Sequence, residues 1–484
     1  MKTTLKIAIL TILATPLFAK TDPLFSPFMD QDALRLTMPS LNGNARFSSM
    51  GGAFGALGGN FGALSTNPAG IGIYRRGELS FTPAITIGQT ETTPERGRMR
   101  ASEPLWNFNM GNLGMVSVID VAKSDSPNEW KKVQFGFGLN RLADFWNRSS
   151  YTNYNDWTYL DVLTDQANDD WYNDFDWCDF YTGLLWDAGL IKGQGPFVND
   201  LSSNGGGLMQ RHTTKTTGAI NEFVISFGAN YGDFLYLGAT LGLPSVNFSQ
   251  ERFLREVDSD NKHPNFREWT LTENLQVSGR GVNLKLGAIV RPADFMRIGF
   301  AYHTPTRYTL KENFYTVVTN SDSRRFRSPE TEFDYSIRTP MRLIGSLGFI
   351  FERRGLLSFE YEMVNYGRMR LSDNQFYYDD DNDFIADNYQ TGGVIRVGGE
   401  VRLNALSLRA GYNHTLVPYT NNFERKFSGH TITGGIGFIA GSTTIDLAYV
   451  NTIRNQHTRP YPDMPVNRYN AMGHQIMATF GWRF

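Results

Sequence analysis

The sequence predicts an all-β fold: a 14-stranded antiparallel transmembrane β-barrel with an N-terminal hatch plugging the lumen and a large extracellular insertion. Three observations lead to this prediction. Apolar and polar residues alternate from Glu78 to the end of the chain, tight turns alternate with long polar loops, and the chain ends on an aromatic strand. The 48 glycines and the 14% of aromatic residues also suit β-hairpins that meet a membrane interface.

The first residues have the features of a secretion signal. Lys2 and Lys6 precede an apolar core, and Ala19 ends a small-residue cleavage site. The alternative is an N-terminal membrane anchor, but Pro16 interrupts an apolar stretch that is already shorter than the ~20 residues of a spanning helix. We therefore predict a signal peptide at residues 1–19 and an exported chain.

Residues 20–77 precede the first expected strand and contain the glycine-rich run SSMGGAFGALGGNFGALSTNPAGIG. Glycine lets a backbone approach a wall closely, and Asn67 before Pro68 favours an extended or capping conformation. Because a barrel lumen of this size needs filling, we expect a compact plug inside the barrel on its periplasmic side. A phosphate-binding loop is the alternative, but the run lacks the GxxxxGK[ST] pattern and a βαβ context.

From residue 78 onward the alternation has a period of two. In MRIGFAYH (296–303) the even positions are apolar, and the odd positions are small, polar or charged. Tight turns such as NYGDF (230–234) and RPADF (291–295) alternate with long polar stretches such as 372–390. A soluble sandwich also alternates, but it has no reason to separate short and long loops onto two sides. The expected strands are 78–90, 105–120, 131–147, 219–231, 233–252, 269–291, 294–315, 332–352, 355–371, 391–403, 405–418, 427–441, 442–455 and 471–484.

The alternation stops after Tyr151 and returns near Gly218, so we place an extracellular insertion at residues 152–218. It combines many aspartates with four tryptophans. These are Trp157, Trp171, Trp177 and Trp186. Two readings stay open: a folded cap over the barrel mouth, or an aromatic surface for an apolar ligand or a partner protein.

The last strand, GHQIMATFGWRF, carries Ile476, Ala478, Phe480, Trp482 and Phe484 on one face. Aromatic girdles of this kind lie at the membrane interfaces of outer-membrane barrels. The ending resembles the terminal signature of bacterial outer-membrane barrels.

A longer stretch, NARFSSMGGAFGALGGNFGALSTNPAGIGIYRRGELSFTPAI (44–85), resembles the N-terminal signature of the FadL-type outer-membrane transporters of long-chain fatty acids and other hydrophobic compounds. IVRPADFMRIGFAYHTPTRYTL is similar to a mid-barrel hairpin of the same family. The resemblance implies a barrel at residues 78–484 and a hatch at residues 20–77 that carries an Asn-Pro-Ala motif, here Asn67, Pro68 and Ala69. With Gly70, these residues are the expected gating element, which would shift when a ligand arrives.

The expected function is passive transport of a hydrophobic small molecule, such as a long-chain fatty acid, across a bacterial outer membrane in contact with its lipid. A carboxylate in the lumen needs a cation, and inward-facing positions supply five candidates. They are Lys285, Arg297, Arg396, Arg402 and Arg409. Glu360, Glu362 and Glu400 share the same face, so ion pairing among these charges, or with the hatch, is the alternative reading.

Two further functions stay open. Haem could be the cargo, with His303, His414 or His430 as an axial ligand, or the barrel could be a scaffold for secretion with an outer-membrane or secreted protein as partner. A net charge of -2 gives no reason to expect a nucleic-acid partner. A single cysteine, Cys178, and the absence of an HExxH motif or a nucleophile elbow argue against an enzyme, a catalytic site, a cofactor or a metal.

Overall fold

The computed structural model describes residues 29–38, 40–94, 100–102, 104–122, 129–155, 158–172, 179–201, 207–352, 354–373, 378–421, 425–458 and 466–484. The predicted signal peptide and residues 20–28 of the predicted hatch lie outside these ranges, as do Trp157, Trp177 and Cys178.

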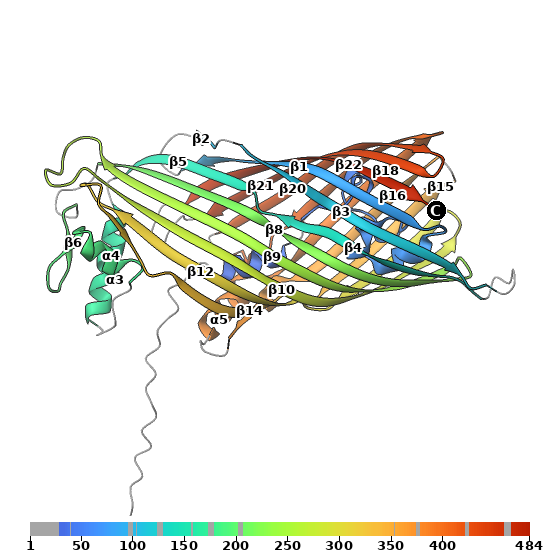
Figure 1. Ribbon diagram of the computed structural model, residues 1–484, viewed down its shortest axis with the longest axis horizontal. Coiled ribbons are helices and arrows are strands. Elements are labelled where there is room, and N and C mark those ends of the chain that lie inside the picture. Colours follow the sequence, from blue (N-terminus) through green and yellow to red (C-terminus); the bar gives the residue numbers. More distant parts are fainter. Residues whose placement is uncertain are drawn as a thin grey trace, which may run out of the picture.

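In this part of the chain a closed 14-strand antiparallel barrel forms, as the sequence predicts (Figure 1). Its strands follow the order of the chain, and the last strand pairs with the first, with Glu78 opposite Arg483 and Thr93 opposite Arg468. The barrel strands are β1 (Glu78–Thr93), β3 (Leu105–Asp120), β4 (Trp130–Asp144) continued by β5 (Asn147–Asn155), β8 (Leu208–Tyr231), β9 (Leu235–Asp258), β10 (Glu268–Ala293), β11 (Met296–His303) continued by β12 (Arg307–Thr319), β14 (Thr331–Arg338) continued by β15 (Arg342–Phe351), β16 (Gly355–Asn365) continued by β17 (Arg370–Ser372), β18 (Thr391–Leu403), β19 (Leu406–Leu416), β20 (Lys426–Ala440), β21 (Thr443–Thr458) and β22 (Asn467–Arg483). Short strands β2 (Arg100–Ala101) and β13 (Arg325–Arg327) pair with β1 and β12.

Several strand limits differ from the expected ones. Pro305 and Pro340 lie between β11 and β12 and between β14 and β15, because proline has no backbone N–H for the ladder. Strand β8 begins at Leu208 and pairs with both β5 and β9, so the predicted insertion limits of 152–218 are too wide. Residues 210–217 are polar on both faces, and the alternation of apolar residues therefore does not reveal this part of β8 as a strand.

The two ends of the barrel differ as predicted. Tight turns gather at the end that carries the C-terminus, and the long connections lie at the other end (Figure 1). Asp233, Glu352, Asn404 and Gly441 take positive φ in the tight turns, as short hairpins require. Between the ends, outward-facing side chains such as Phe108, Phe300 and Ile432 form an apolar outer band.

The described part of the insertion is a cap on the long-loop end. Its helices are α3 (Tyr159–Tyr172) and α4 (Thr182–Asp187), with a small hairpin of β6 (Ile191–Lys192) and β7 (Val198–Asn199). These helices share one apolar core with the ends of the barrel strands and with α5 (Asp379–Asn388). Buried Glu256 accepts hydrogen bonds from the Tyr159 amide at 2.9 Å and from Trp269 Nε1 at 2.6 Å. These bonds tie the start of α3 to strands β9 and β10. No described helix is long and apolar enough to cross a membrane.

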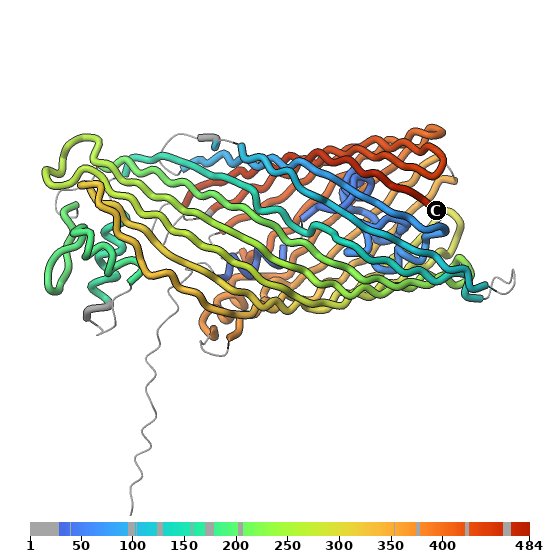
Figure 2. The backbone as a smooth tube through the Cα atoms, in the orientation of Figure 1, coloured from blue at the N-terminus to red at the C-terminus, as the bar shows by residue number. Residues whose placement is uncertain are grey.

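Residues 29–77, called here the N-terminal segment, lie inside the barrel, where Figures 1 and 2 show them in blue. The segment contains α1 (Met29–Thr37), α2 (Ala45–Ser49), η1 (Phe61–Ser65) and η2 (Pro68–Ile73). The expectation that all of it lies at the tight-turn side is wrong for α1. The carboxylate of Asp30 accepts a bond from the Tyr389 hydroxyl at 2.6 Å and pairs with Arg425 at the long-loop end. The apolar face of α1 joins the core of the cap, and this burial draws the helix across the lumen.

A ring of inward-facing barrel glycines makes room for the N-terminal segment. A Cβ added to Gly287 would lie 2.0 Å from Asn67 Oδ1, and one added to Gly238 would lie 2.3 Å from the Pro68 carbonyl. The ring passes through nine strands. Its members are Gly114, Gly138, Gly228, Gly238, Gly287, Gly299, Gly398, Gly411 and Gly435. Contacts shorter than 3.0 Å are not tolerated at a real Cβ, so the segment and the wall fit only because these side chains are absent.

We expect Gly238→Val to push the N-terminal segment away from the wall and to lower the free energy of unfolding by about 2 kcal/mol, as overpacking does. Urea unfolding and limited proteolysis of the segment measure both effects. Gly345→Val is the matched control, because a Cβ at Gly345 meets nothing within 4 Å. Equal stability and equal protease resistance of the two variants would contradict this account of the ring.

Candidate functional site

Two cavities lie inside the barrel and share Met38, Ser40, Leu41 and Asn42 of the N-terminal segment in their linings. The first cavity, of about 130 Å³, is rich in charged side chains from the barrel wall. The second cavity, of about 350 Å³, is lined by more apolar side chains. These include Leu34, Phe145, Phe248, Tyr419 and Met472. The lumen therefore contains a smaller, charged cavity and a larger, more apolar cavity.

Lys285 and Arg396, two buried cations of the first cavity, pair with carboxylates of the barrel wall. Lys285 lies 2.5 Å from the Glu222 carboxylate, which also accepts a bond from the Ser65 hydroxyl at 2.8 Å. Arg396 bridges Glu360 at 2.6 Å and Glu362 at 2.5 Å. Lys285 and Arg396 thus each have a carboxylate partner, which offsets the cost of a charge in a low-dielectric interior.

The remaining predicted cations contact the N-terminal segment or form ion pairs near the tight-turn end of the barrel. Arg297 donates to the Leu57 carbonyl at 2.6 Å, and Arg409 pairs with both Glu400 and Asp446. Arg402 pairs with Glu400 at 2.6 Å from an exposed position at the tight-turn end. The ion-pairing alternative therefore describes these residues in the structure, and their role as ligand contacts stays a prediction.

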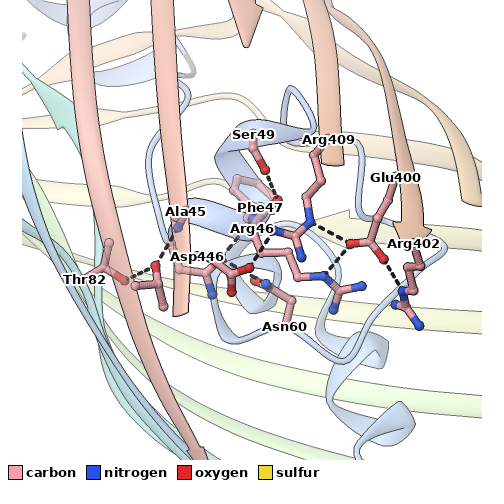
Figure 3. Close-up of polar contacts among 12 residues, drawn as sticks. Ala45, Arg46, Phe47, Ser49, Asn60, Thr82, Glu400, Arg402, Arg409 and Asp446 are labelled. Carbon is pink, nitrogen blue, oxygen red and sulfur yellow. Dashed lines mark hydrogen bonds and ion pairs between the residues drawn. The ribbon is translucent and has the colours of Figure 1, made fainter. Parts of the chain in front are cut away.

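Glu400 is the centre of a polar cluster between the N-terminal segment and the wall (Figure 3). It accepts bonds from Arg409 at 2.7 Å and from Arg46 of α2 at 3.1 Å. Burial alone would lower the pKa of Arg46, but Glu400 and Asp446 outweigh it and raise that pKa. Arg46 therefore stays charged and attaches α2 to β18. Nearby, the Ala45 amide donates to Thr479 Oγ1 at 2.7 Å and fixes the same helix to β22.

The predicted Asn-Pro-Ala motif lies against the glycine ring. Asn67 is buried, and its Oδ1 accepts a bond from the Ala69 amide at 3.0 Å while its Nδ2 donates to the Gly55 carbonyl at 2.6 Å. Pro68 opens the 3₁₀ turn η2, and the Gly59 amide donates to the Gly70 carbonyl at 2.9 Å. The motif thus ties two distant turns of the N-terminal segment together, directly beside β9 and β10.

Sequence reasoning missed Arg454 of β21. It lines both cavities and has no ion-pair partner among the residues that the structure describes. Its place on the inward face of the alternation in residues 443–458 is the signal that could have found it. Arg342, which the sequence analysis also passed over, pairs with Glu362 at 2.9 Å and donates to the Thr37 carbonyl at 2.6 Å.

The three candidate histidines are not together. His303 faces the lumen with Nε2 2.8 Å from the Thr66 carbonyl. His414 and His430 stack with ring centroids 4.7 Å apart, at positions that share the outward face with Tyr412 and Ile432. Among the described residues, no group of three or more His, Cys, Asp or Glu side chains could hold a metal ion.

The hydrogen-bonded wall is interrupted between β3 and β4. In the described residues these strands pair only from Asn112–Asn140 to Asp120–Lys132, so Leu105–Gly111 of β3 has β1 as its one ladder partner. The chain after β4 bends inward and passes close to β1. A Cβ at Gly88 of β1 would lie only 2.1 Å from the Trp146 carbonyl oxygen. Asn107 Nδ2 donates across the interruption to Asp144 at 3.0 Å.

This interruption borders the second cavity. Asp144, Phe145, Trp146 and Asn147, which form the bend, belong to the lining of that cavity. On the inner side the N-terminal segment passes close by, since a Cβ at Gly111 would lie 2.6 Å from the Gly43 carbonyl oxygen. The second cavity is therefore adjacent to this interruption of the β3–β4 ladder.

No protein-family model matches the sequence, and no curated protein matches it significantly. Solved structures do match. The toluene transporter TodX of Pseudomonas putida aligns with a TM-score of 0.55 over 92% of this chain and 99% of its own, at 13% identity. A FadL homologue of Pseudomonas aeruginosa aligns with a TM-score of 0.55 over 93% of this chain and 100% of its own, at 13% identity. The chain has the FadL-type barrel fold.

A third structure with this fold is the toluene transporter TbuX of Ralstonia pickettii, with a TM-score of 0.52 over 92% of this chain and 99% of its own, at 13% identity. At such identities the FadL-type likeness concerns the fold, and side-chain roles have to come from the chain itself.

Glu400→Gln removes the charge that Arg46, Arg402 and Arg409 share, leaves Arg46 without its carboxylate partner and leaves Arg409 with Asp446 alone. We expect a loss of about 3 kcal/mol in the free energy of unfolding and a leakier barrel, because breaking a buried ion pair is costly. Chemical unfolding and single-channel conductance measure these effects. Glu332→Gln is the control: it breaks the exposed pair with Lys311, and its expected cost is below about 1 kcal/mol.

Proposed function

We propose that this protein is an outer-membrane channel for the passive, diffusion-driven entry of hydrophobic small molecules. The interruption between β3 and β4 beside the second cavity carries the proposal. The N-terminal segment fills the lumen toward the tight-turn end, so a ligand in the second cavity has a shorter way out through the wall than along the axis. An apolar outer band around the barrel suits a lipid environment for this exit.

The route begins at the long-loop end, which faces the outside of the cell. A ligand enters beside the cap, occupies the apolar second cavity and leaves sideways past Asn107 and Asp144. The fold supports this assignment, since the structures that share it include proteins described as toluene transporters. No catalytic constellation is part of the proposal.

Long-chain fatty acids belong to the proposed cargo. Their carboxylate needs a cation that is not already neutralised, and Arg454 offers one at the border of the two cavities. The paired cations Lys285 and Arg396 then serve to hold the wall and the segment. Haem has less support, because two of its three candidate ligands lie on the outer face. The scaffold alternative has no comparable contact in its favour, since the described aromatic residues of the insertion mostly pack on the barrel mouth.

Closing the interruption tests the route. Asn107→Cys with Asp144→Cys, in a Cys178→Ser background, can be joined by a short thiol-specific cross-linker. We expect uptake of a hydrophobic probe to fall by about tenfold on cross-linking, because the lateral exit is sealed. The measurement is probe uptake by whole cells.

The control joins Ile119→Cys to Val133→Cys, which oppose each other on the outer face in the intact part of the β3–β4 ladder. Cross-linking there should leave uptake unchanged. Full uptake after cross-linking at Asn107 and Asp144 would reject the lateral route.

The predicted hatch motif gives a second test. Asn67→Ala removes the bonds to Gly55 and Ala69, and Pro68→Ala removes the fixed φ that opens η2. We expect each variant to change uptake at least severalfold while the barrel keeps its heat-modifiable gel mobility. Unchanged uptake in both variants would show that movement of this motif is not needed.

A further inference from the structure

The outer wall carries a row of arginines that the channel does not use. Arg307 of β12, Arg338 of β14 and Arg370 of β17 are direct cross-strand neighbours, with Arg338 opposite both of the others. All three are exposed. Their neighbours Tyr308, Ile337 and Leu371 are buried in the internal core, so the three guanidinium groups point outward. We call Arg307, Arg338 and Arg370 the arginine row.

Such a row is unfavourable by itself. Like charges directly opposite each other on a sheet destabilise it, and strands in a ladder are only about 4.8 Å apart. In the described part of the chain, Arg307 and Arg338 have no ion pair or hydrogen bond, and Arg370 donates only to the carbonyls of Gly367 and Met369. The first acidic side chain on this face of β14 is Asp334, two outward positions nearer the long-loop end and opposite Lys311. Glu332, one outward position further, already pairs with Lys311. Among the described residues, the three guanidinium groups of the row therefore have no carboxylate partner.

The height of the row identifies its surroundings. On β10, Val282 is opposite Arg307, and the outward side chains Leu284 and Leu286 follow toward the tight-turn end; all three are exposed and apolar. Directly above it, the outward residues are Thr309, Ser336 and Ser372. The row thus marks the border between the apolar band and the polar part of the wall.

The thickness of the band agrees with this border. From Val282 to Val290 a strand advances about 26 Å at ~3.3 Å per residue, which a tilt of about 40° converts to about 20 Å of height. The outward apolar band of such barrels is about 25 Å tall. The arginine row accordingly lies at the level of lipid headgroups on the long-loop side.

We propose that the arginine row binds the phosphate of an outer-leaflet lipid whose headgroup carries a phosphomonoester. Guanidinium groups form bidentate, charge-assisted hydrogen bonds with phosphate, and a phosphomonoester placed between neighbouring arginines cancels their repulsion. Arg280, which is exposed one step up on β10 and diagonal to Arg307, extends the same surface. The acyl chains of the lipid then lie over Val282, Leu284 and Leu286. This inference rests on the proposed placement of the barrel in an outer membrane.

The test uses the full chain in detergent, titrated with phosphatidic acid and followed by native mass spectrometry. Arg307→Gln, Arg338→Gln and Arg370→Gln together should raise the dissociation constant of the tightest-bound phosphatidic acid by about tenfold or more. The control variant, with Arg75→Gln, Arg291→Gln and Arg354→Gln, removes the same charge at the tight-turn end and should leave that constant unchanged. Phosphatidylcholine with the same acyl chains, a zwitterionic diester, should bind equally to all three proteins.

Equal affinity for phosphatidic acid in the wild type and the arginine-row variant would overturn the proposal. Displacement of the lipid by inorganic phosphate at equal concentration would also overturn it, because the site would then take free phosphate. If the triple variant does not show the gel mobility of a folded barrel, Arg338→Gln alone replaces it, with an expected loss of about threefold.

Uptake of a hydrophobic probe distinguishes the proposed lipid site from the proposed channel function. The arginine-row variant should keep full uptake, because the row faces away from both cavities. A wild-type protein that binds phosphatidic acid but shows no uptake contradicts the channel alone. A protein that transports but loses no lipid affinity in the variant contradicts the lipid site alone.

Discussion

Contact between the backbone of the N-terminal segment and the barrel wall is the constraint on which the rest of the structure depends. Nine strands place glycine where the segment passes, and at Gly287 even one carbon atom would collide with Asn67. The Asn67 amide then replaces hydrogen bonds that water would otherwise supply to Gly55 and Ala69. The barrel wall and the N-terminal segment therefore form one packed interior. The two cavities are the part of the lumen that the segment leaves open.

The same packing explains the use of charge. A cation enclosed in the lumen must be neutralised, and Glu222, Glu362 and Glu400 do this for Lys285, Arg396 and Arg409. These pairs stabilise the geometry around the N-terminal segment. Because their charges are already neutralised, these cations are poor contacts for an anionic ligand. Arg454 lines both the charged and the apolar cavity and has no ion-pair partner among the described residues. It is therefore the better candidate to bind the polar end of a ligand.

The alternation and the asymmetry of turns were enough to predict the barrel and its strand number, because lipid on one side and a packed lumen on the other impose them. The first part of β8, at the long-loop end, escaped prediction. Between the apolar band and the long-loop end both faces of β8 are polar, so residues 210–217 have the composition of a loop. The inward cations could also be predicted, but their partners could not. Lys285 and Glu222 come from β10 and β8, which meet only because Gly242 of the intervening β9 leaves a gap between them.

The position of the seam between β1 and β22 has a consequence for biogenesis. The ring closes where the strand that directly follows the segment meets the last strand of the chain. In the closed barrel, α1 reaches the long-loop end, and the wall at Gly238 and Gly287 is in tight contact with Asn67 and Pro68. Threading the segment into a finished cylinder would mean reopening that seam. The natural order of assembly is therefore to wrap the sheet around its own amino terminus, which then acts as an internal template for the diameter of the cylinder.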